Sequence, residues 1–359
     1  GVDRYEQKET LGTENYFIDG SIEKGFVNEK MVNRNLTWEE TTVTNIGLDL
    51  GFWRSKLTTE LDFYDRLTTG MNRPSDLSSL LTGAYEAPRR NIGNLRNRGV
   101  EVNITWRDQT RTIGYSINAN ASYNATILEE WNEFLTRGFV YLDMPYRFLY
   151  TYVDRGIAQT WQDVFNATPQ GARPGDILRE DLNGDGRIDG NDLKAYPNSL
   201  RDRPTTNFAL NANLSWKNFD LAILMQGSAG RKDYWLNNYN NVNFPATHYA
   251  STWDHWNEPW SVENRDGAWP RLYGNNNRAN TTFWLDNMSY LRFKNLQLGY
   301  TIPGRLLQRF GVSNIRIYGS GENLMTFTKY RGLDPEKRTY ANEVYPLNKV
   351  FLIGINIGI

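Results

Sequence analysis

The sequence has 359 residues, a length that allows either two ordinary domains or one large all-β unit. Lys and Arg total 40 against 41 Asp and Glu, so no basic field attracts nucleic acid, and we expect no nucleic-acid partner. Cysteine is absent, which excludes disulfide frameworks, thiolate metal sites and cysteine nucleophiles.

Membrane helices are also excluded by the sequence. No stretch approaches the ~18 consecutive apolar residues that a membrane helix needs, so any membrane role must come from strands. Aromatic residues nevertheless make up 14% of the chain. The first residues contain neither the charged nor the apolar part of a signal peptide, and we expect that a longer chain precedes them.

Alternation of apolar and polar residues with a period of two predicts strands through most of the chain. The expected strands, about ten in all, include residues 42–53, 56–69, 100–107, 115–124, 207–216, 219–229, 289–301, 314–328 and 348–359. Short helices are expected at 126–136 and 304–310. The polar positions carry mainly Asn, Ser, Thr and Gly rather than Lys and Glu, which suits a crowded polar lumen better than the wet face of a soluble sandwich.

Turn lengths predict that the two ends of this sheet differ. The turns at 54–55 and 217–218 are short, whereas the connections at 70–98, 128–203 and 230–284 are long and rich in Asn, Trp, Pro and Gly. Long loops at one end and short turns at the other are typical of an outer-membrane barrel, with the long loops extracellular. The predicted fold is therefore all-β, an antiparallel transmembrane β-barrel or part of one.

One acidic stretch, residues 181–192, has the spacing of a calcium-binding loop. Its candidate ligands, at positions 1, 3, 5, 7, 9 and 12, are Asp181, Asn183, Asp185, Arg187 through its backbone carbonyl, Asp189 and Asp192. Gly186 allows the sharp turn, and Asp192 replaces the longer Glu of the strongest sites. The spacing predicts a structural Ca²⁺ site. The alternative is an Asx-rich turn without metal, because Asp, Asn and Gly favour turns.

Four tryptophans lie in one long connection: Trp253, Trp256, Trp260 and Trp269. Rings beside polar groups predict a surface that binds a sugar or a peptide. The alternatives are a small core within the loop or an interfacial girdle. The chain has only two histidines and no nucleophile elbow, so we expect no enzyme.

Several longer stretches resemble the C-terminal barrel portion of SusC/RagA-type TonB-dependent transporters of Bacteroidota. They include LTWEE at 36–40, NIGNLRNRGVE at 91–101, PGDI at 174–177, SYLRFKNLQLGY at 289–300 and DPE at 334–336. The resemblance covers nearly the whole chain and is more specific than any single motif.

The resemblance implies a 22-stranded barrel with an N-terminal plug and a SusD-like surface lipoprotein over its mouth. Residues 1–359 would be the C-terminal portion of that barrel, without the plug. Its partners would be outer-membrane lipid, the remaining N-terminal part of the transporter and, through the plug, the TonB complex. The implied function is import of an oligosaccharide or oligopeptide across the bacterial outer membrane. The alternatives are a secreted calcium-stabilised carbohydrate-binding β protein or glycoside hydrolase, and a passive adhesin or porin.

Overall fold

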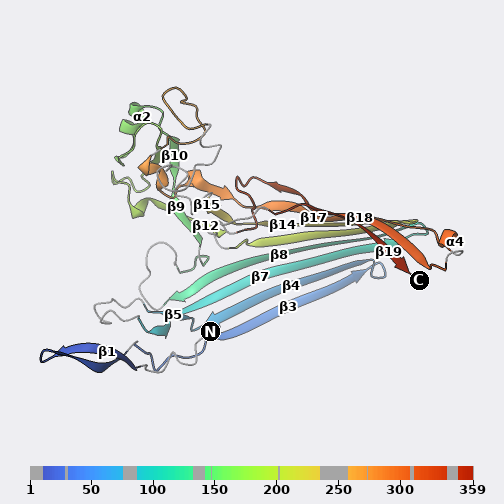
Figure 1. Ribbon diagram of the computed structural model, residues 1–359, viewed down its shortest axis with the longest axis horizontal. Coiled ribbons are helices and arrows are strands. Elements are labelled where there is room, and N and C mark those ends of the chain that lie inside the picture. Colours follow the sequence, from blue (N-terminus) through green and yellow to red (C-terminus); the bar gives the residue numbers. More distant parts are fainter. Residues whose placement is uncertain are drawn as a thin grey trace. The chain divides into compact units, whose positions relative to one another are not determined.

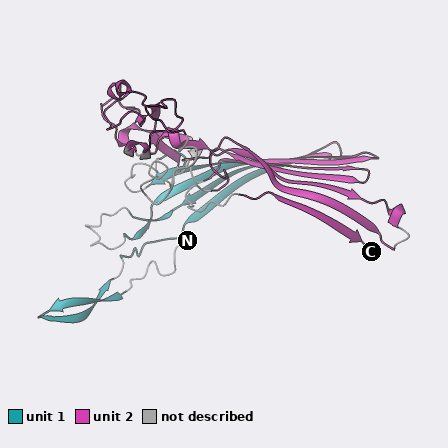
Figure 2. Cartoon of the chain, turned by 45° about the horizontal axis from the view of Figure 1, so that its top comes forward, with its two compact units in different colours: residues 1–47, 62–100, 124–146 teal, residues 48–61, 101–123, 147–359 magenta. Residues whose placement is uncertain are grey.

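The computed structural model describes residues 11–28, 31–75, 87–131, 142–146, 148–200, 203–234, 258–272, 274–307, 311–337 and 347–358. The chain divides into two compact units (Figure 2). Unit 1 comprises residues 1–47, 62–100 and 124–146, and unit 2 comprises residues 48–61, 101–123 and 147–359.

In the described part of the chain, nine strands form one sheet in the order β19-β18-β17-β14-β13-β8-β7-β4-β3 (Figure 1). In chain order they are β3 (Glu40–Phe52), β4 (Leu57–Thr69), β7 (Gly93–Gln109), β8 (Ile113–Trp131), β13 (Thr206–Trp216), β14 (Phe219–Ala229), β17 (Tyr290–Thr301), β18 (Asn314–Thr328) and β19 (Val350–Gly358). Each corresponds to one of the nine predicted ranges, and β14 and β18 match to the residue. The prediction of an all-β antiparallel fold is confirmed, with nine strands in the sheet rather than about ten.

Short turns connect neighbouring strands at one end of the sheet. Lys217 and Asn218 join β13 to β14, and Trp216 pairs with Phe219 across them. Lys217 has a φ of 54°, and the Asn218 side-chain amide donates to the carbonyl of Thr301 in β17 at 2.9 Å. Such turns fix the register, because a slip of one residue would move every side chain to the other face.

The helix predicted for residues 126–136 is wrong over its described part, because residues 126–131 form the end of β8. The Thr126 hydroxyl donates to the side-chain carbonyl of Asn97, and the Asn94 amide donates to the Glu130 carboxylate. These contacts with β7 override the helical propensity of Leu128 and its neighbours. The long connection predicted at 70–98 is shorter for the same reason, since β7 begins at Gly93. Residues 132–136 lie outside the described residues.

The predicted helix at 304–310 is present as α4 (Gly304–Leu307), and residues 308–310 lie outside the described part. An additional hairpin in unit 1, β1 (Leu11–Ile18) with β2 (Ser21–Asn28), was not predicted. Its turn consists of Asp19 and Gly20, both with positive φ, and Asp-Gly is a recognised hairpin signal in sequences.

The remaining elements are short and lie between the long strands. They are β5 (Asn72–Pro74), β6 (Arg89–Asn91), β9 (Phe148–Tyr152), β10 (Asp154–Ile157), α2 (Trp161–Asn166), β11 (Ile177–Arg179), η1 (Gly190–Asp192), β12 (Leu193–Leu200), β15 (Lys232–Tyr234), η2 (Asn275–Arg278), η3 (Thr282–Trp284) and β16 (Leu285–Asn287). Among the described residues, no helix is long and apolar enough to cross a membrane.

Candidate binding wall and loop assembly

One face of the sheet carries large apolar side chains that remain exposed. On β19 the residues at alternate positions, Phe351, Ile353, Ile355 and Ile357, are all exposed, and Ile353 reaches 86%. The neighbouring strand continues this face, because Ile317 pairs with Ile355. A contiguous apolar face of this kind is too costly to leave in water and marks a contact surface.

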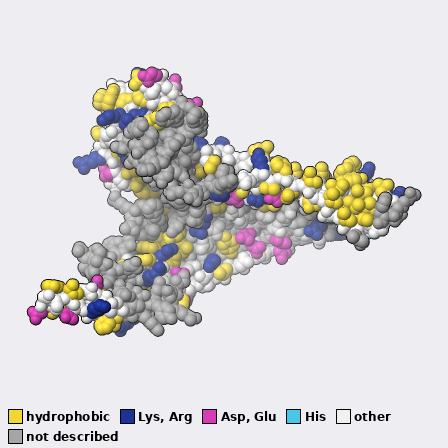
Figure 3. Space-filling view, in the orientation of Figure 1, with side chains coloured by type: hydrophobic (Ala, Val, Ile, Leu, Met, Phe, Trp, Pro, Cys, Tyr) yellow, Lys and Arg dark blue, Asp and Glu magenta, His cyan; other side chains and the backbone are white. Residues whose placement is uncertain are grey.

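Aromatic side chains gather on the same face at the short-turn end of unit 2: Trp53, Trp106, Tyr115, Trp216, Phe219 and Tyr300. The ring centroids of Phe219 and Tyr300 are 4.8 Å apart, and Trp106 Nε1 donates to the Tyr115 hydroxyl at 3.2 Å. Figure 3 shows hydrophobic side chains gathered at this end of the sheet. A row of aromatic rings bordering an apolar band is typical of the interface between a membrane barrel and water.

The opposite face is lined by amides and hydroxyls that bond to one another. The Asn118 amide donates to the Asn103 side-chain carbonyl at 2.6 Å and to the Thr105 hydroxyl at 2.8 Å. The Asn103 amide in turn donates to Glu60 at 2.8 Å. This polar face offers both donors and acceptors, which suits solutes that form many hydrogen bonds. We call it the polar wall.

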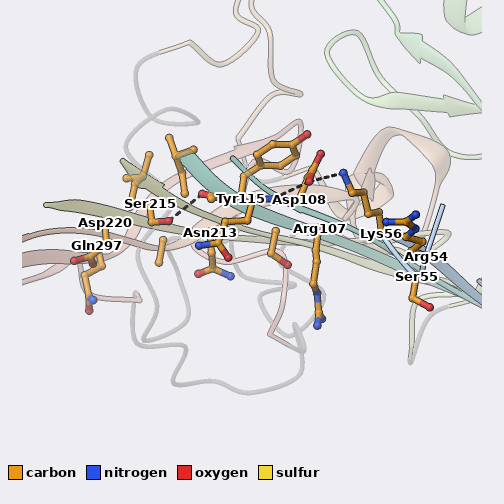
Figure 4. A pocket seen from close by; sticks show the side chains of 16 residues that line it. Arg54, Ser55, Lys56, Arg107, Asp108, Tyr115, Asn213, Ser215, Asp220 and Gln297 are labelled. Carbon is orange, nitrogen blue, oxygen red and sulfur yellow. Dashed lines mark hydrogen bonds and ion pairs between the residues drawn. The ribbon is translucent and has the colours of Figure 1, made fainter. Parts of the chain in front are cut away.

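A hollow of about 740 Å³ lies over the short-turn end of the sheet (Figure 4). Arg107, Asn213 and Gln297 project together on one side of the strands there, and Asp220 also lines the hollow. Arg316 reaches Asp220 from two strands away, with Nε donating to Oδ1 at 2.9 Å.

This ion pair needs a glycine on the intervening strand. Gly299 of β17 pairs with Asp220 and lies beneath the bridge, and a Cβ atom there would be 2.5 Å from Asp220 Oδ1 and 2.6 Å from Arg316 Nη2. The absence of a side chain at Gly299 therefore lets β14 and β18 be joined by charge across β17.

The long connections of unit 2 fold into an assembly with its own core, which we call the loop assembly (Figure 1). One cluster consists of Leu149, Ile177, Tyr234, Trp269 and Trp284, and a second of Ala158, Ala167, Ala172 and Leu178. Helix α2 begins with a capping box, in which Thr160 and Asp163 bond each other's backbone. Hydrogen bonds from the Thr160 backbone and side chain hold the pKa of Asp163 below its ordinary value.

Asp176 fixes two distant segments of the loop assembly to each other. Its side chain is 1% exposed and accepts from Arg271 Nε at 2.7 Å, from Arg271 Nη2 at 3.2 Å and from the Asn277 amide at 3.2 Å. Gly175 before it has a φ of +88° and lies against the ring of Trp260, which leaves no room for a side chain. Asp176 and Gly175 belong to the PGDI stretch, which carries part of the family resemblance. The sequence alone did not indicate their role in holding the loop assembly together.

The acidic loop at 181–192 is held by its own carboxylates. Asp181 accepts from the backbone N–H of Gly184 at 2.7 Å and of Gly186 at 2.9 Å. Burial by itself would raise the pKa of Asp181, but these bonds and one from Thr168 outweigh it and lower the pKa. Asp192 is buried and accepts from the N–H of Leu182 at 2.9 Å.

The other four predicted ligands lie in the same loop. The Asn183 and Asp185 side chains bond each other at 3.0 Å, Asp185 Oδ1 accepts from the N–H of Arg187, and Asp189 Oδ1 accepts from that of Asn191. Within the described part of the chain, no group of three or more His, Cys, Asp or Glu side chains is arranged to hold a metal ion. Calcium binding stays a prediction.

Two of the four tryptophans lie inside the loop assembly. Trp260 is buried and donates Nε1 to the Gln159 side-chain carbonyl at 2.8 Å. Trp269 is buried and stacks on Trp284 with ring centroids 6.1 Å apart. Trp253 and Trp256 lie outside the described residues, and a role of the four rings in substrate binding stays a prediction.

Comparison with known proteins identifies relatives along nearly the whole chain. No protein-family model matches. TonB-dependent receptor P3 of Formosa agariphila is 29% identical over 372 residues, covering 93% of this chain and 35% of the relative. TonB-dependent receptor SusC of Bacteroides thetaiotaomicron is 26% identical over 343 residues, covering 91% of this chain and 33% of the relative.

Solved structures share the fold. The RagAB peptide transporter superposes with a TM-score of 0.76 at 21% identity, over 99% of this chain and 39% of that chain. This chain thus spans about a third of the length of the curated relatives that it matches. We expected no enzyme, and the curated relatives that the chain matches are TonB-dependent receptors. The resemblance seen in the sequence is confirmed: the chain matches part of the barrel of SusC/RagA-type TonB-dependent receptors.

Proposed function

We propose that residues 1–359 are the C-terminal portion of an outer-membrane importer that takes up an oligosaccharide or an oligopeptide. The observation that carries the proposal is the distribution of apolar side chains. In unit 2 the buried clusters lie in the loop assembly, whereas the long strands expose their apolar residues, as on β19. Lipid is the solvent that such a face requires. The polar wall would then line the passage for the solute.

The whole importer needs parts that this chain does not supply. A sheet whose edge strands are β3 and β19 needs further strands before it can close in a bilayer. The remaining N-terminal part would provide those strands and a plug, through which the TonB complex drives uptake. The likeness to the RagAB peptide transporter supports a SusD-like lipoprotein over the long-loop end.

Uptake by the full-length receptor tests this proposal. A strain carrying the receptor is compared with a receptor deletion and with a TonB deletion, using fluorescent maltooligosaccharides and fluorescent casein peptides as probes. Import of one probe that disappears in both deletions supports the proposal and selects the substrate class. Import that persists without TonB would instead indicate a passive porin, and a receptor that is released without detergent would indicate a secreted protein.

We further propose that the loop at 181–192 binds calcium and thereby stiffens the loop assembly. Support comes from the ligand spacing and from Gly186, whose φ of +80° allows the turn. Calorimetric titration of the EDTA-treated receptor with calcium tests this. Loss of binding heat in Asp185→Asn, and its retention in Asp266→Asn, would support the site. Equal heats in the two variants would exclude it.

A further inference from the structure

A cluster of charged side chains lies on the polar wall, away from the acidic loop and the hollow, and Arg292 and Asp334 in it are buried. At its centre is Arg292 of β17, which is 2% exposed. Its Nη2 donates to Asp334 Oδ1 at 2.8 Å, its Nη1 to Glu336 Oε2 at 2.6 Å, and its Nε to the Thr326 hydroxyl at 2.8 Å. One guanidinium therefore binds two carboxylates of the segment that follows β18.

The same segment, residues 330–337, is attached at further points, and we call it the strap. Arg231 Nη2 donates to the carbonyl of Lys337 at 3.1 Å, and the Gln226 amide donates to Glu336 Oε1 at 3.1 Å. At the other end of the strap, the Arg331 backbone N–H donates to Asp286 Oδ2 at 3.0 Å, and its Nε donates to Oδ1 at 2.9 Å.

The register of the strands shows which face the strap covers. Gln226 of β14 pairs with Arg292 of β17, and Arg292 pairs with Thr326 of β18, so these three side chains lie on one face of three neighbouring strands. The same face carries the polar wall: Leu224, two residues before Gln226 on β14, pairs with Asn211 of β13, and Asn211 pairs with Asn118 of the polar wall. The strap therefore rests on the polar wall and not on the apolar face.

We propose that the strap is a fixed part of the wall past which the solute moves, and that Arg292 is its positioning residue. This inference rests on the proposed import function, whereas the attachment of the strap to the wall is independent of that function. Segments that move during function come from the least stable parts of a protein, whereas lifting the strap would leave the buried Arg292 without its carboxylates. The strap would thus shape the passage permanently instead of opening and closing it.

Hydrogen exchange of the full-length receptor in detergent tests the attachment. The amides of Glu336 and Lys337 are bonded to Asp334, at 3.0 Å and 3.3 Å. In Arg292→Met we expect both to exchange at least ~10-fold faster, while the Arg331 amide, held by Asp286, is unchanged. The exposed Arg305→Met serves as the matched control. Unchanged exchange at Glu336 and Lys337 in Arg292→Met would overturn the proposal. Asp334→Asn, which leaves the strand intact, gives a second variant should Arg292→Met fail to assemble.

A cross-link distinguishes a fixed strap from a gate. This chain has no cysteine, so Gln226→Cys with Glu336→Cys, in a receptor cleared of other cysteines, can be joined by a short bismaleimide. After cross-linking, uptake of the two fluorescent probes should keep its maximal rate and the probe concentration that gives half of that rate. In Arg292→Met this half-saturating concentration should change, and the cross-link should restore the wild-type value. Uptake abolished by the cross-link would show a gate. Absence of uptake in the unmodified receptor would reject the import function, and hydrogen exchange would still decide the attachment.

Discussion

At the scale of single residues, Asp176 determines how firmly the loop assembly holds together. Asp176→Asn keeps the shape but removes the charge that binds Arg271. Because a hydrogen bond to a charged group contributes about 1.5–3 kcal/mol, the assembly should lose roughly that much local stability. The amide of Ile177, bonded to the Asn277 side chain at 2.8 Å, reports the loss by faster hydrogen exchange. The exposed Asp266→Asn is the control. If the Ile177 amide exchanges as slowly in Asp176→Asn as in this control, Asp176 is dispensable.

Tyr330, at the start of the strap, should make stability depend on pH in the alkaline range. Burial, and then the carboxylates of Asp233 and Asp286, raise the pKa of Tyr330 from 10.0 to about 12. The folded chain therefore keeps a proton that the unfolded chain releases near pH 10. The contribution to the free energy of unfolding is complete below pH 10 and is lost as the pH rises through 12. Urea unfolding of wild type and Tyr330→Phe should diverge only above pH 10, and parallel pH profiles would contradict this.

At the scale of elements, the polar wall depends on bridges that cross a strand. Gly299→Ala should break the bridge between Asp220 and Arg316 and lower the free energy of unfolding by about 1–3 kcal/mol, the usual cost of overpacking. In an Asp220→Asn background the bridge is already weakened, so the same substitution should cost less. A double-mutant cycle of urea unfolding in lipid vesicles measures this coupling. Strictly additive costs would show that Gly299 serves another purpose.

The sequence predicts the long strands well because each alternates between two environments along its own length. That local signal placed all nine strands of the sheet, including the ends of β14. It failed at residues 126–131, where contacts with Asn94 and Asn97 decide the structure. It also missed the Asp19-Gly20 hairpin, although the turn signal was present.

Candidate sites that lie within a short stretch were likewise predicted from the sequence, whereas contacts between distant residues were not. The acidic loop was predicted from the spacing of its ligands within twelve residues. The four tryptophans were recognised because they occur together in one long connection. Arg292 and Asp334 are 42 residues apart in the sequence, so no local sequence pattern indicates that they pair. Both residues lie in stretches that carry the family resemblance, but only the structure shows that their side chains are in contact.

At the scale of the whole molecule, the two parts of unit 2 meet different solvents. The loop assembly buries its own apolar clusters and needs no lipid. The long strands leave Ile353 and its neighbours uncovered, and under the proposed function this face would lie against lipid while the polar wall meets water. In the proposed importer, successive residues of one strand therefore face lipid and lumen in turn.

Strand β13 allows the most direct test of that claim, because the chain contains no cysteine. Single cysteines are placed along residues 207–214 of the full-length receptor in lipid vesicles and treated with a water-soluble maleimide. We expect residues 207, 209, 211 and 213 to react, and residues 208, 210, 212 and 214 to stay unlabelled until detergent is added. Uniform labelling of all eight positions in vesicles would contradict a membrane-spanning strand and with it the proposed importer.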